Sequence, residues 1–492
     1  MNHWLILPIL IPAVTAPLLM ITARFDMLLS RVFCVGANVA QVIVALILVQ
    51  ALSVSGPDTY DLGGWVAPYG IELTADLWTA MFLLLAAVLG VVVSIAAMDG
   101  EDERGRYFHA LFLFQMMGIN GAFLTGDLFN LFVFFEVMLL ASYGLMVHGG
   151  GTGRLRAGVQ FVVINLVGST LFLIGVSLVY GACGSLNLQD VAARAAAIPL
   201  GNQNAMLTGI ALMIGVFAVK SAVVPFHVWL PATYREGPPI VTALFSVTSK
   251  VGVYAILRLG LALEMWDVES PFHVIAWWMM PLALATSIIG GLGALGSKRL
   301  GEMAGYAVIA SMGTILIGVA VATREALVAA HYYLLHSTLA GAGLFLIVAL
   351  VQENRGQARD AIRPAAWKRR SGLIGSGYFC AAVAMVGLPP LSGFIGKILL
   401  LSSLSDSPWW LWSWSVVLGT SLLMLVGMTR SGIIVFWSSE STEASPRRGP
   451  RGVLTLVAVG CLAAILIAMT ISAAAFLQFL DQAIGHLLKL AS

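Results

Sequence analysis

An all-α, polytopic membrane fold is predicted by three features of the sequence. Hydrophobic residues make up 59% of the 492 positions and charged residues only 10%, whereas a soluble domain carries about 25% charged residues. The mean hydropathy is +0.94. Apolar runs of about 20 residues, the length that crosses a bilayer as a helix, follow one another with short breaks of Gly, Pro or charge. The polar stretches between them are too short to form a soluble domain.

The apolar runs define about fourteen transmembrane helices. The first run, "MNHWLILPILIPAVTAPLLM", lacks the basic residues that precede a signal sequence, so we expect a membrane helix there. The predicted helices lie near residues 4–23, 31–53, 74–98, 107–124, 127–147, 158–181, 204–230, 239–262, 273–296, 301–323, 325–351, 373–405, 410–437 and 452–482.

The seventh and twelfth helices are predicted to be broken. In "VFAVKSAVVPFHVWLPATYREGPP", Pro225 follows Lys220 by five residues and cannot donate the backbone hydrogen bond that a continuous helix needs. In "AMVGLPPLSGFIGKILL", Pro389 and Pro390 precede Lys397. The run 373–405 is also too long for one straight crossing at about 1.5 Å per residue.

The two predicted breaks suggest an internal repeat. Each broken helix is the fourth of a run of five, helices 4–8 and helices 9–13, and paired broken helices are typical of transporters built from inverted repeats. We therefore expect N-terminal helices in 1–106, a first five-helix repeat in 107–272, a second in 273–437, and a loop with helix 14 in 438–492.

The basic residues predict how the chain lies in the membrane. Of the 26 Lys and Arg residues, nineteen fall in the odd-numbered loops and three in the even-numbered loops or at the C-terminus. Cytoplasmic loops carry the excess of basic residues. The protein is therefore expected in the cell inner (plasma) membrane, with both termini on the non-cytoplasmic side.

Four charged residues lie well inside predicted helices: Glu136, Lys220, Lys250 and Lys397. A charge at the centre of a membrane helix costs roughly 2.5–3.5 kcal/mol on insertion scales. Such residues must therefore face one another, water or the protein interior, and they usually mark an ion path. Each could instead belong to a structural ion pair.

Three histidines are further candidates for a proton path. His227 follows the break of helix seven, and His331 and His336 lie five residues apart in helix eleven. Histidine can exchange protons near neutral pH, but a membrane histidine can also be a hydrogen-bonded packing residue. His227 and His331 are therefore expected only as possible relays. Asn165, in helix six, is expected to join neighbouring helices.

Cofactor chemistry finds no support in the sequence. Cys34, Cys183, Cys380 and Cys461 are far apart in apolar segments, without the spacing of a metal site or a disulfide framework. Haem ligands, iron–sulfur motifs and nucleotide-binding loops are also not found. We therefore expect no cofactor and no bound metal, and an enzyme in its own right is disfavoured.

Several motifs resemble a known family. "GAFLTGDLFNLFVFFEVMLLASYGL", "VKSAVVPFHVWLPATYREGPPIVTALFSVTSKVGVYAILR" and "GLPPLSGFIGK" are similar to the antiporter-like subunits shared by respiratory complex I and Mrp-type cation/proton antiporters. The form "TGDLFNLFVFFEV" and the later "TRSGIIVFWSS" most resemble the D-subunit branch of the Mrp type. The resemblance covers roughly residues 70–437.

The resemblance implies a role for each candidate residue. Glu136 matches the glutamate of helix five, and Lys220 matches the lysine of helix seven with which it pairs. Lys250 matches the connecting lysine of helix eight, His336 the histidine of helix eleven, and Lys397 the terminal residue of helix twelve. The chain departs from its relatives at Ala340, where they often carry a lysine, and in "AVIASMG", where they often have a Ser-rich stretch with Gln.

These observations predict a proton-translocating subunit of a multisubunit monovalent cation (Na⁺)/proton antiporter. A proton reaching the buried pair of Glu136 and Lys220 would change the field at Lys250, which would pass its proton toward His336 and Lys397. The alternative is the same subunit in a redox complex: NADH–quinone oxidoreductase, hydrogenase or a formate-linked complex. The expected partners are other subunits, the lipid bilayer, protons and Na⁺, and no nucleic acid.

Overall fold

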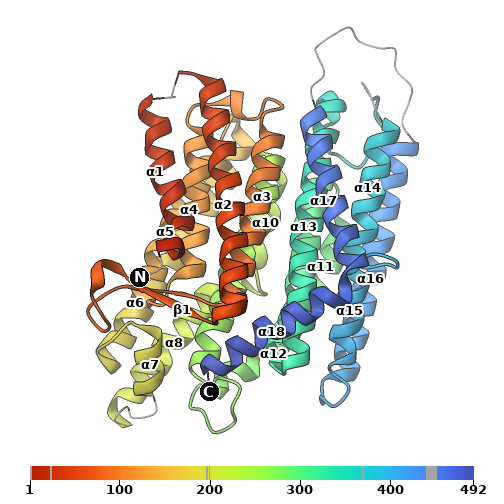
Figure 1. Ribbon diagram of the computed structural model, residues 1–492. Coiled ribbons are helices and arrows are strands. Elements are labelled where there is room, and N and C mark those ends of the chain that lie inside the picture. The colour runs from red at the N-terminus through yellow and green to blue at the C-terminus, as the bar shows by residue number, and fades with distance from the viewer. Residues whose placement is uncertain are drawn as a thin grey trace.

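The computed structural model describes residues 3–22, 25–195, 198, 200–367, 371–438 and 452–491. Nearly all of this part of the chain is helical (Figure 1). The α-helices are α1 (Leu7–Thr22), α2 (Met27–Ser55), α3 (Leu77–Ala97), α4 (Phe108–Leu124), α5 (Leu128–Met146), α6 (Thr152–Cys183), α7 (Leu188–Ala195), α8 (Leu200–Lys220), α9 (Trp229–Glu236), α10 (Pro239–Ala262), α11 (His273–Gly296), α12 (Leu300–Val321), α13 (Arg324–Asn354), α14 (Ser371–Val386), α15 (Ser392–Ser402), α16 (Trp410–Gly432), α17 (Val453–Ile471) and α18 (Ala473–Ala491).

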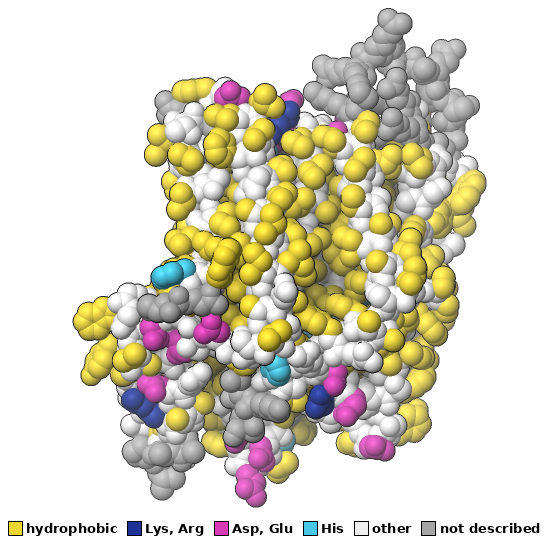
Figure 2. All heavy atoms as spheres, viewed as in Figure 1, with side chains coloured by type: hydrophobic (Ala, Val, Ile, Leu, Met, Phe, Trp, Pro, Cys, Tyr) yellow, Lys and Arg dark blue, Asp and Glu magenta, His cyan; other side chains and the backbone are white. Residues whose placement is uncertain are grey.

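The prediction of an all-α membrane fold is confirmed. Within the described residues, eleven helices are long and apolar enough to cross a membrane, and α1, α4, α14 and α15 are shorter apolar helices. Every predicted segment contains helix. Charged side chains appear only toward the two ends of the molecule in Figure 2, and hydrophobic side chains cover the height between them. This apolar surface is what a bilayer requires.

Both predicted breaks are present. Helix seven consists of α8, the short 3-10 turn Phe226–Val228 and α9, and α8 ends at Lys220. Helix twelve consists of α14 and α15, which five residues separate, and Lys397 lies in α15. Each lysine is therefore placed close to a point where backbone groups leave the helical hydrogen-bond pattern.

The fourteenth predicted helix is wrong as a single span, because the chain turns at Ser472 and continues as α18. The buried residues of α18 include Leu480, Ala483, Ile484 and Leu487, a spacing that gives an amphipathic helix with one apolar face. This helix runs obliquely across the lower end of the molecule in Figure 1. It contacts α3 and α13, and Asp481 pairs with Arg324 at 2.6 Å.

A small β-hairpin was not predicted. Strands β1 (Asp58–Asp61) and β2 (Glu72–Ala75) pair antiparallel. The helix predicted from residue 74 begins instead at Leu77, because the carboxylate of Asp76 accepts a hydrogen bond from the Thr79 amide at 2.7 Å and caps α3. The short helix α7 was not predicted either.

The centre of the molecule is formed by α10 and α13, the two most enclosed helices. They pack against each other, and α10 also contacts α3 and α8. By contrast, α2, α6, α16 and α17 expose many large apolar side chains, which suits helices that face lipid. Lys250 lies on α10 and His336 on α13, so these candidate residues occupy the best-shielded positions.

The described odd-numbered loops gather at one end, which we call the basic end. Arg31 pairs with Asp102 at 2.7 Å, and Arg299 pairs with both Glu236 at 2.9 Å and Asp360 at 2.7 Å. These contacts involve five loop regions that the basic residues had assigned to one side of the membrane. Seven of the counted residues lie outside the described part: Arg24, Lys368, Arg369, Arg370, Arg447, Arg448 and Arg451.

Candidate functional site

Five of the seven predicted site residues are buried inside the helical bundle: Lys220, Lys250, His331, His336 and Lys397. Glu136 and His227 are half-buried. The residues come from α5, α8, the turn after α8, α10, α13 and α15, so the site is spread over most of the bundle.

Lys220 is held by a side-chain amide at the end of α8. Its Nζ donates to Oδ1 of Asn165 on α6 at 2.6 Å, and Nδ2 of Asn165 donates to the Phe161 carbonyl at 2.6 Å. The second bond turns the amide oxygen of Asn165 toward the ammonium. Asn165 was expected only to join helices, and the structure makes it a direct partner of the candidate proton carrier.

The break after Lys220 is stabilised by side chains from other elements. The indole Nε1 of Trp229 donates to the Val219 carbonyl at 2.9 Å, and the Val224 amide donates to Oγ1 of Thr286 on α11 at 3.0 Å. Buried backbone groups that lose their helical partners need such replacements. The position of Lys220 therefore depends on contacts from two distant segments as well as on Pro225.

A direct ion pair between Glu136 and Lys220, which we predicted, is not formed. The Lys220 ammonium is bonded to Asn165 instead, and the carboxylate of Glu136 acts on it only through space. In the described part of the chain, the buried Oε1 of Glu136 accepts no hydrogen bond. The spacing of charges along a sequence cannot show which of two acceptors a flexible lysine reaches.

A small cavity lies beside Lys220. It measures about 20 Å³, and Gln115, Ser142, Tyr234 and Thr248 contribute polar atoms to its wall. A volume of about 10–15 Å³ is enough for one water molecule if polar partners surround it. The cavity can therefore hold a water between the lysine and neighbouring hydroxyl groups.

Gln115 is a residue that sequence reasoning missed. It is fully buried on α4, and neither atom of its amide has a hydrogen-bond partner among the described residues. The available signal was the single amide inside the apolar run "FHALFLFQMMGI". An amide that lines a cavity beside Lys220 can orient water there, because it offers both donors and an acceptor.

Lys250 is fully buried in the middle of α10. Its Nζ has no hydrogen-bond partner in the described part of the chain, and the same holds for Oγ of Ser246 one turn earlier. A permanently charged ammonium without a partner would be very costly there. The geometry therefore suits a group whose charge changes or whose partner is a transient water.

His336 and Lys397 come together at the break between α14 and α15. Nδ1 of His336 lies 2.8 Å from Oγ of Ser392, and Nε2 lies 2.9 Å from the Ala384 carbonyl. Nζ of Lys397 donates to the carbonyl of Val386, the last residue of α14, at 2.8 Å. The last carbonyl groups of a helix lack intrahelical partners, and the negative C-terminal end of the helix dipole favours a nearby cation.

Two further contacts complete the surroundings of Lys397. Its Nζ donates to Oγ of Ser421 on α16 at 2.7 Å and lies 5.6 Å from the ring centre of Tyr333. The rings of Tyr333 and His336 are stacked with centres 6.1 Å apart. The aromatic ring therefore contacts both ionisable groups.

His331 and His227 lie apart from this chain of contacts. The His331 ring meets Trp78 and Phe82 of α3 edge to face, and its Nδ1 is 2.6 Å from the Leu327 carbonyl. His227 is flanked by Phe226 and Val228, which are about half exposed on the apolar surface. The surroundings of both histidines suit packing, and their relay roles stay predictions.

Ala340 has apolar surroundings, unlike the candidate proton carriers. It lines an apolar cavity of about 40 Å³ together with residues such as Gly343, Cys380 and Leu462. The structure therefore puts no polar side chain at this position. Within the described residues, no group of three or more His, Cys, Asp or Glu side chains could hold a metal ion.

These features define a membrane protein with three buried lysines, two of them at broken helices, and similarity to known proteins identifies its family. The chain belongs to the family described as NADH:quinone oxidoreductase/Mrp antiporter, transmembrane, whose profile matches residues 125–424. It is 36% identical over 473 residues to the probable D subunit of a K⁺/H⁺ antiporter from Rhizobium meliloti, with 89% of this chain and 88% of the relative covered.

Two further proteins are similar over nearly the whole chain. The D subunit of the Na⁺/H⁺ antiporter of Bacillus subtilis is 35% identical, and the match covers 95% of this chain and 94% of the relative. A chain in the structure of the Mrp complex from Dietzia superposes with a TM-score of 0.86 at 26% identity, covering 99% of this chain and 98% of that one.

Proposed function

We propose that this protein is the proton-translocating subunit of a multisubunit monovalent cation/proton antiporter in the plasma membrane. The names of two relatives and the Mrp assembly support this assignment. One relative is named for K⁺ and another for Na⁺, so the proposal covers alkali cations, with Na⁺ as the expected one. Such a subunit is a transporter and not an enzyme, and its partners are the other subunits of the complex.

The observation that carries this proposal is the unpaired ammonium of Lys250. A buried lysine that stays charged is expected to have an acceptor, and the charged forms of Lys220 and Lys397 each have one. Lys250 lies on α10, which contacts α8 directly and α13, the neighbour of α15, and it lacks such an acceptor in the described part of the chain. A lysine that alternates between neutral and charged forms fits this position.

The mechanism follows from the electrostatics of the buried groups. A proton that binds Glu136 removes the negative charge that stabilises the Lys220 ammonium through space. The altered charge of that pair changes the field at Lys250, which then gives up its proton toward His336 and Lys397. These groups titrate as a coupled set, so each transfer alters the proton affinity of the next.

We further propose a membrane orientation and an internal organisation. The basic end faces the cytoplasm, and both termini lie on the other side, as the positive-inside rule suggests. Residues 107–272 and 273–437 form two repeats of inverted topology that are preceded by 1–106 and followed by 438–492. The recurrence of a broken fourth helix in each run of five supports this division.

Three variants of Lys250 test the function. Arginine keeps the positive charge but does not release its proton at working pH. If Lys250 passes protons, Lys250→Arg should be nearly as inactive as Lys250→Ala, at least tenfold below wild type in cation-dependent proton flux of reconstituted complex. Lys250→His, which is smaller and titratable, should recover part of the flux with a changed pH optimum. An active arginine variant beside an inactive histidine variant would refute the proposal.

The alternative is an equivalent subunit of a redox complex, because the family includes NADH:quinone oxidoreductase. Purification of the intact complex from its native membrane separates the two. Co-elution of flavin or iron–sulfur subunits would favour the redox complex, whereas cation-dependent proton flux without them would favour the antiporter.

A further inference from the structure

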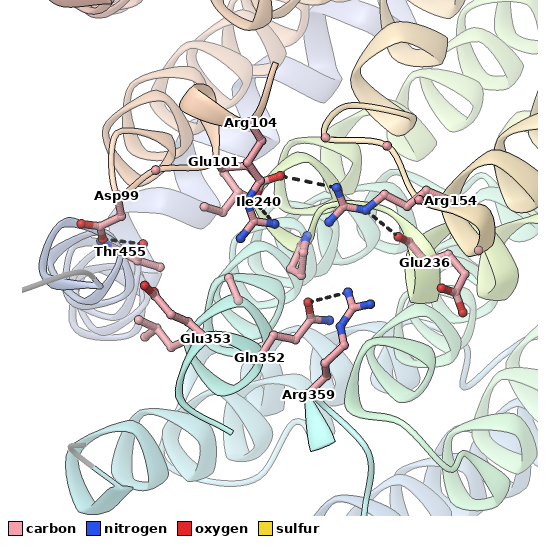
Figure 3. Close-up of a pocket in the computed structure, with 18 of the residues that line it drawn as sticks. Asp99, Glu101, Arg104, Arg154, Glu236, Ile240, Gln352, Glu353, Arg359 and Thr455 are labelled. Atoms are coloured by element: carbon pink, nitrogen blue, oxygen red, sulfur yellow. Dashed lines mark hydrogen bonds and ion pairs between the residues drawn. The ribbon is translucent and has the colours of Figure 1, made fainter. Parts of the chain in front are cut away.

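A large polar cavity opens at the basic end, away from the buried site. It has a volume of about 440 Å³ and is formed by the α3–α4 loop, the Gly-rich α5–α6 loop, the start of α10 and the end of α13 (Figure 3). Seven charged side chains line it from several directions: Asp99, Glu101, Arg104, Arg154, Glu236, Glu353 and Arg359.

Most of these charged groups are held in structural contacts. Asp99 accepts from the amide of Thr455 at 2.6 Å and from its hydroxyl at 2.8 Å, which anchors the start of α17. Arg359 donates to the amide oxygen of Gln352 at 3.1 Å. Arg154 donates to the backbone carbonyl of Glu236 at 3.3 Å.

Glu101 is buried but incompletely hydrogen-bonded. It is only 5% exposed, and in the described part of the chain its Oε1 accepts no hydrogen bond. Oε1 forms a long ion pair with Nη1 of Arg154 on α6 at 3.9 Å, and Oε2 pairs with Arg104 at 3.1 Å. Figure 3 shows the carboxylate between these two arginines at the wall of the cavity. Oε1 therefore has a long ion pair but no hydrogen bond, which leaves it able to bind a proton.

The surroundings of Glu101 shift its pKa in opposite directions. Burial raises the pKa of Glu101, and the acidic neighbour Asp102 acts the same way, whereas Arg104, Arg154 and Arg359 oppose the shift. The ring Nε2 of His148 lies 2.9 Å from the Glu101 backbone carbonyl. Burial lowers the pKa of His148, so this ring stays neutral at neutral pH. The net result is a carboxyl that binds protons more readily than an exposed glutamate.

One face of α10 leads from the cavity to Lys250. Pro239 lines the cavity, and Thr242, Ser246 and Lys250 follow it at intervals of three, four and four residues, which places all four on one side of the helix. Eleven residues of helix span about 16 Å at 1.5 Å each. The hydroxyl of Ser246 lies beside Gly341 of α13, whose far end also lines the cavity.

We propose that this cavity is the cytoplasmic mouth of the proton path and that Glu101 is the carboxyl at which protons exchange with the cytoplasm. The step is a simple protonation: Oε1 binds a proton and later releases it toward the hydroxyls on α10 or back to the cytoplasm. The inference rests on the proposed function, because it names the cytoplasmic end of the same proton path.

The first experiment measures protonation of Glu101 without any transport assay. Dicyclohexylcarbodiimide adds to protonated, shielded carboxyl groups, and mass spectrometry of the labelled complex locates the product. We expect labelling at Glu101 that declines as the pH rises, with a midpoint above the ordinary glutamate value of about 4.3. Glu103, two residues away and half exposed in its pair with Arg31, should stay unlabelled and serves as the internal control. Absence of labelling at Glu101 would overturn the proposal.

The second experiment measures cation-dependent proton flux in reconstituted complex. Glu101→Gln should reduce flux at least fivefold and remove its dependence on the pH of the cytoplasmic side, Glu101→Asp should retain most of it, and the matched control Glu103→Gln should behave as wild type. Normal flux in Glu101→Gln beside a transporting wild type would overturn this inference alone. A wild-type complex without such flux would overturn the proposed function instead, whatever the labelling shows.

Discussion

Lys220 and Lys397 both lie at broken helices, but their surroundings differ in kind. Lys220 has one amide oxygen as its acceptor, with the carboxylate of Glu136 further away. Lys397 has a helix-end carbonyl, a serine hydroxyl and the face of Tyr333. The Lys220 ammonium is therefore sensitive to the charge of Glu136, whereas the Lys397 ammonium is held by neutral dipoles.

In the proposed proton path, this difference would divide the work between a first half around Glu136 and Lys220 and a second half around His336 and Lys397. Protonation of Glu136 changes the electrostatic energy of Lys220 at once, so the first half can respond to an arriving proton. Around Lys397 the hydrogen-bond acceptors that we find carry no net charge, and the carbonyl of Val386 is fixed by the end of α14. We therefore expect the first half to act as the switch that responds to an arriving proton. The second half should act as a holding site for the charged form of Lys397.

The largest expected effect comes from removing the charge of Glu136. Glu136→Gln keeps the size of the side chain but can neither stabilise the Lys220 ammonium nor accept a proton, so cation-dependent proton flux should fall at least tenfold. Glu136→Asp should keep part of the flux because the charge is retained. Vesicle flux assays with subunit content checked by gel would measure both. Flux near wild type in the glutamine variant would show that the first half does not switch through this carboxylate.

An intermediate effect is expected when the partners of the two lysines are removed in parallel. Asn165→Leu takes away the only hydrogen-bond acceptor that we find for Lys220, and an unsatisfied buried polar group costs about 1–3 kcal/mol. Ser421→Ala takes away one of two acceptors of Lys397 and leaves the Val386 carbonyl in place.

Flux should therefore fall several-fold in Asn165→Leu. In Ser421→Ala it should fall less than threefold. Thermal stability of the purified complex, measured alongside, separates lost transport from lost folding. Equal losses in the two variants would contradict the contrast between a singly held and a multiply held ammonium.

Much of the architecture was predictable because it depends on local chemistry. Apolar runs located the helices, prolines located the breaks at Lys220 and Lys397, and the cost of burying charge singled out Glu136 and Lys250. Such signals are contained in short stretches of the sequence and need no knowledge of distant contacts.

The remaining features depend on contacts between distant segments. The bond from Lys220 to Asn165 joins residues 55 positions apart, and the position of Gln115 beside the same lysine depends on how α4 packs. The turn at Ser472 was missed because the apolar face of α18 continues the hydrophobic run of α17. Hydropathy alone does not separate a crossing helix from one that lies across the end of the bundle.

The smallest expected effect concerns Ala340, which lies on α13 four residues after His336. Its apolar cavity of about 40 Å³ has room for added methyl groups, so Ala340→Val should change the stability of the complex by less than about 1 kcal/mol and leave flux within twofold of wild type. Ala340→Lys would instead place an ammonium among apolar groups and should lower the melting temperature without raising flux. Higher flux in the lysine variant would show that the second half is limited by a missing proton carrier at this position, and would contradict its role as a holding site that is already complete.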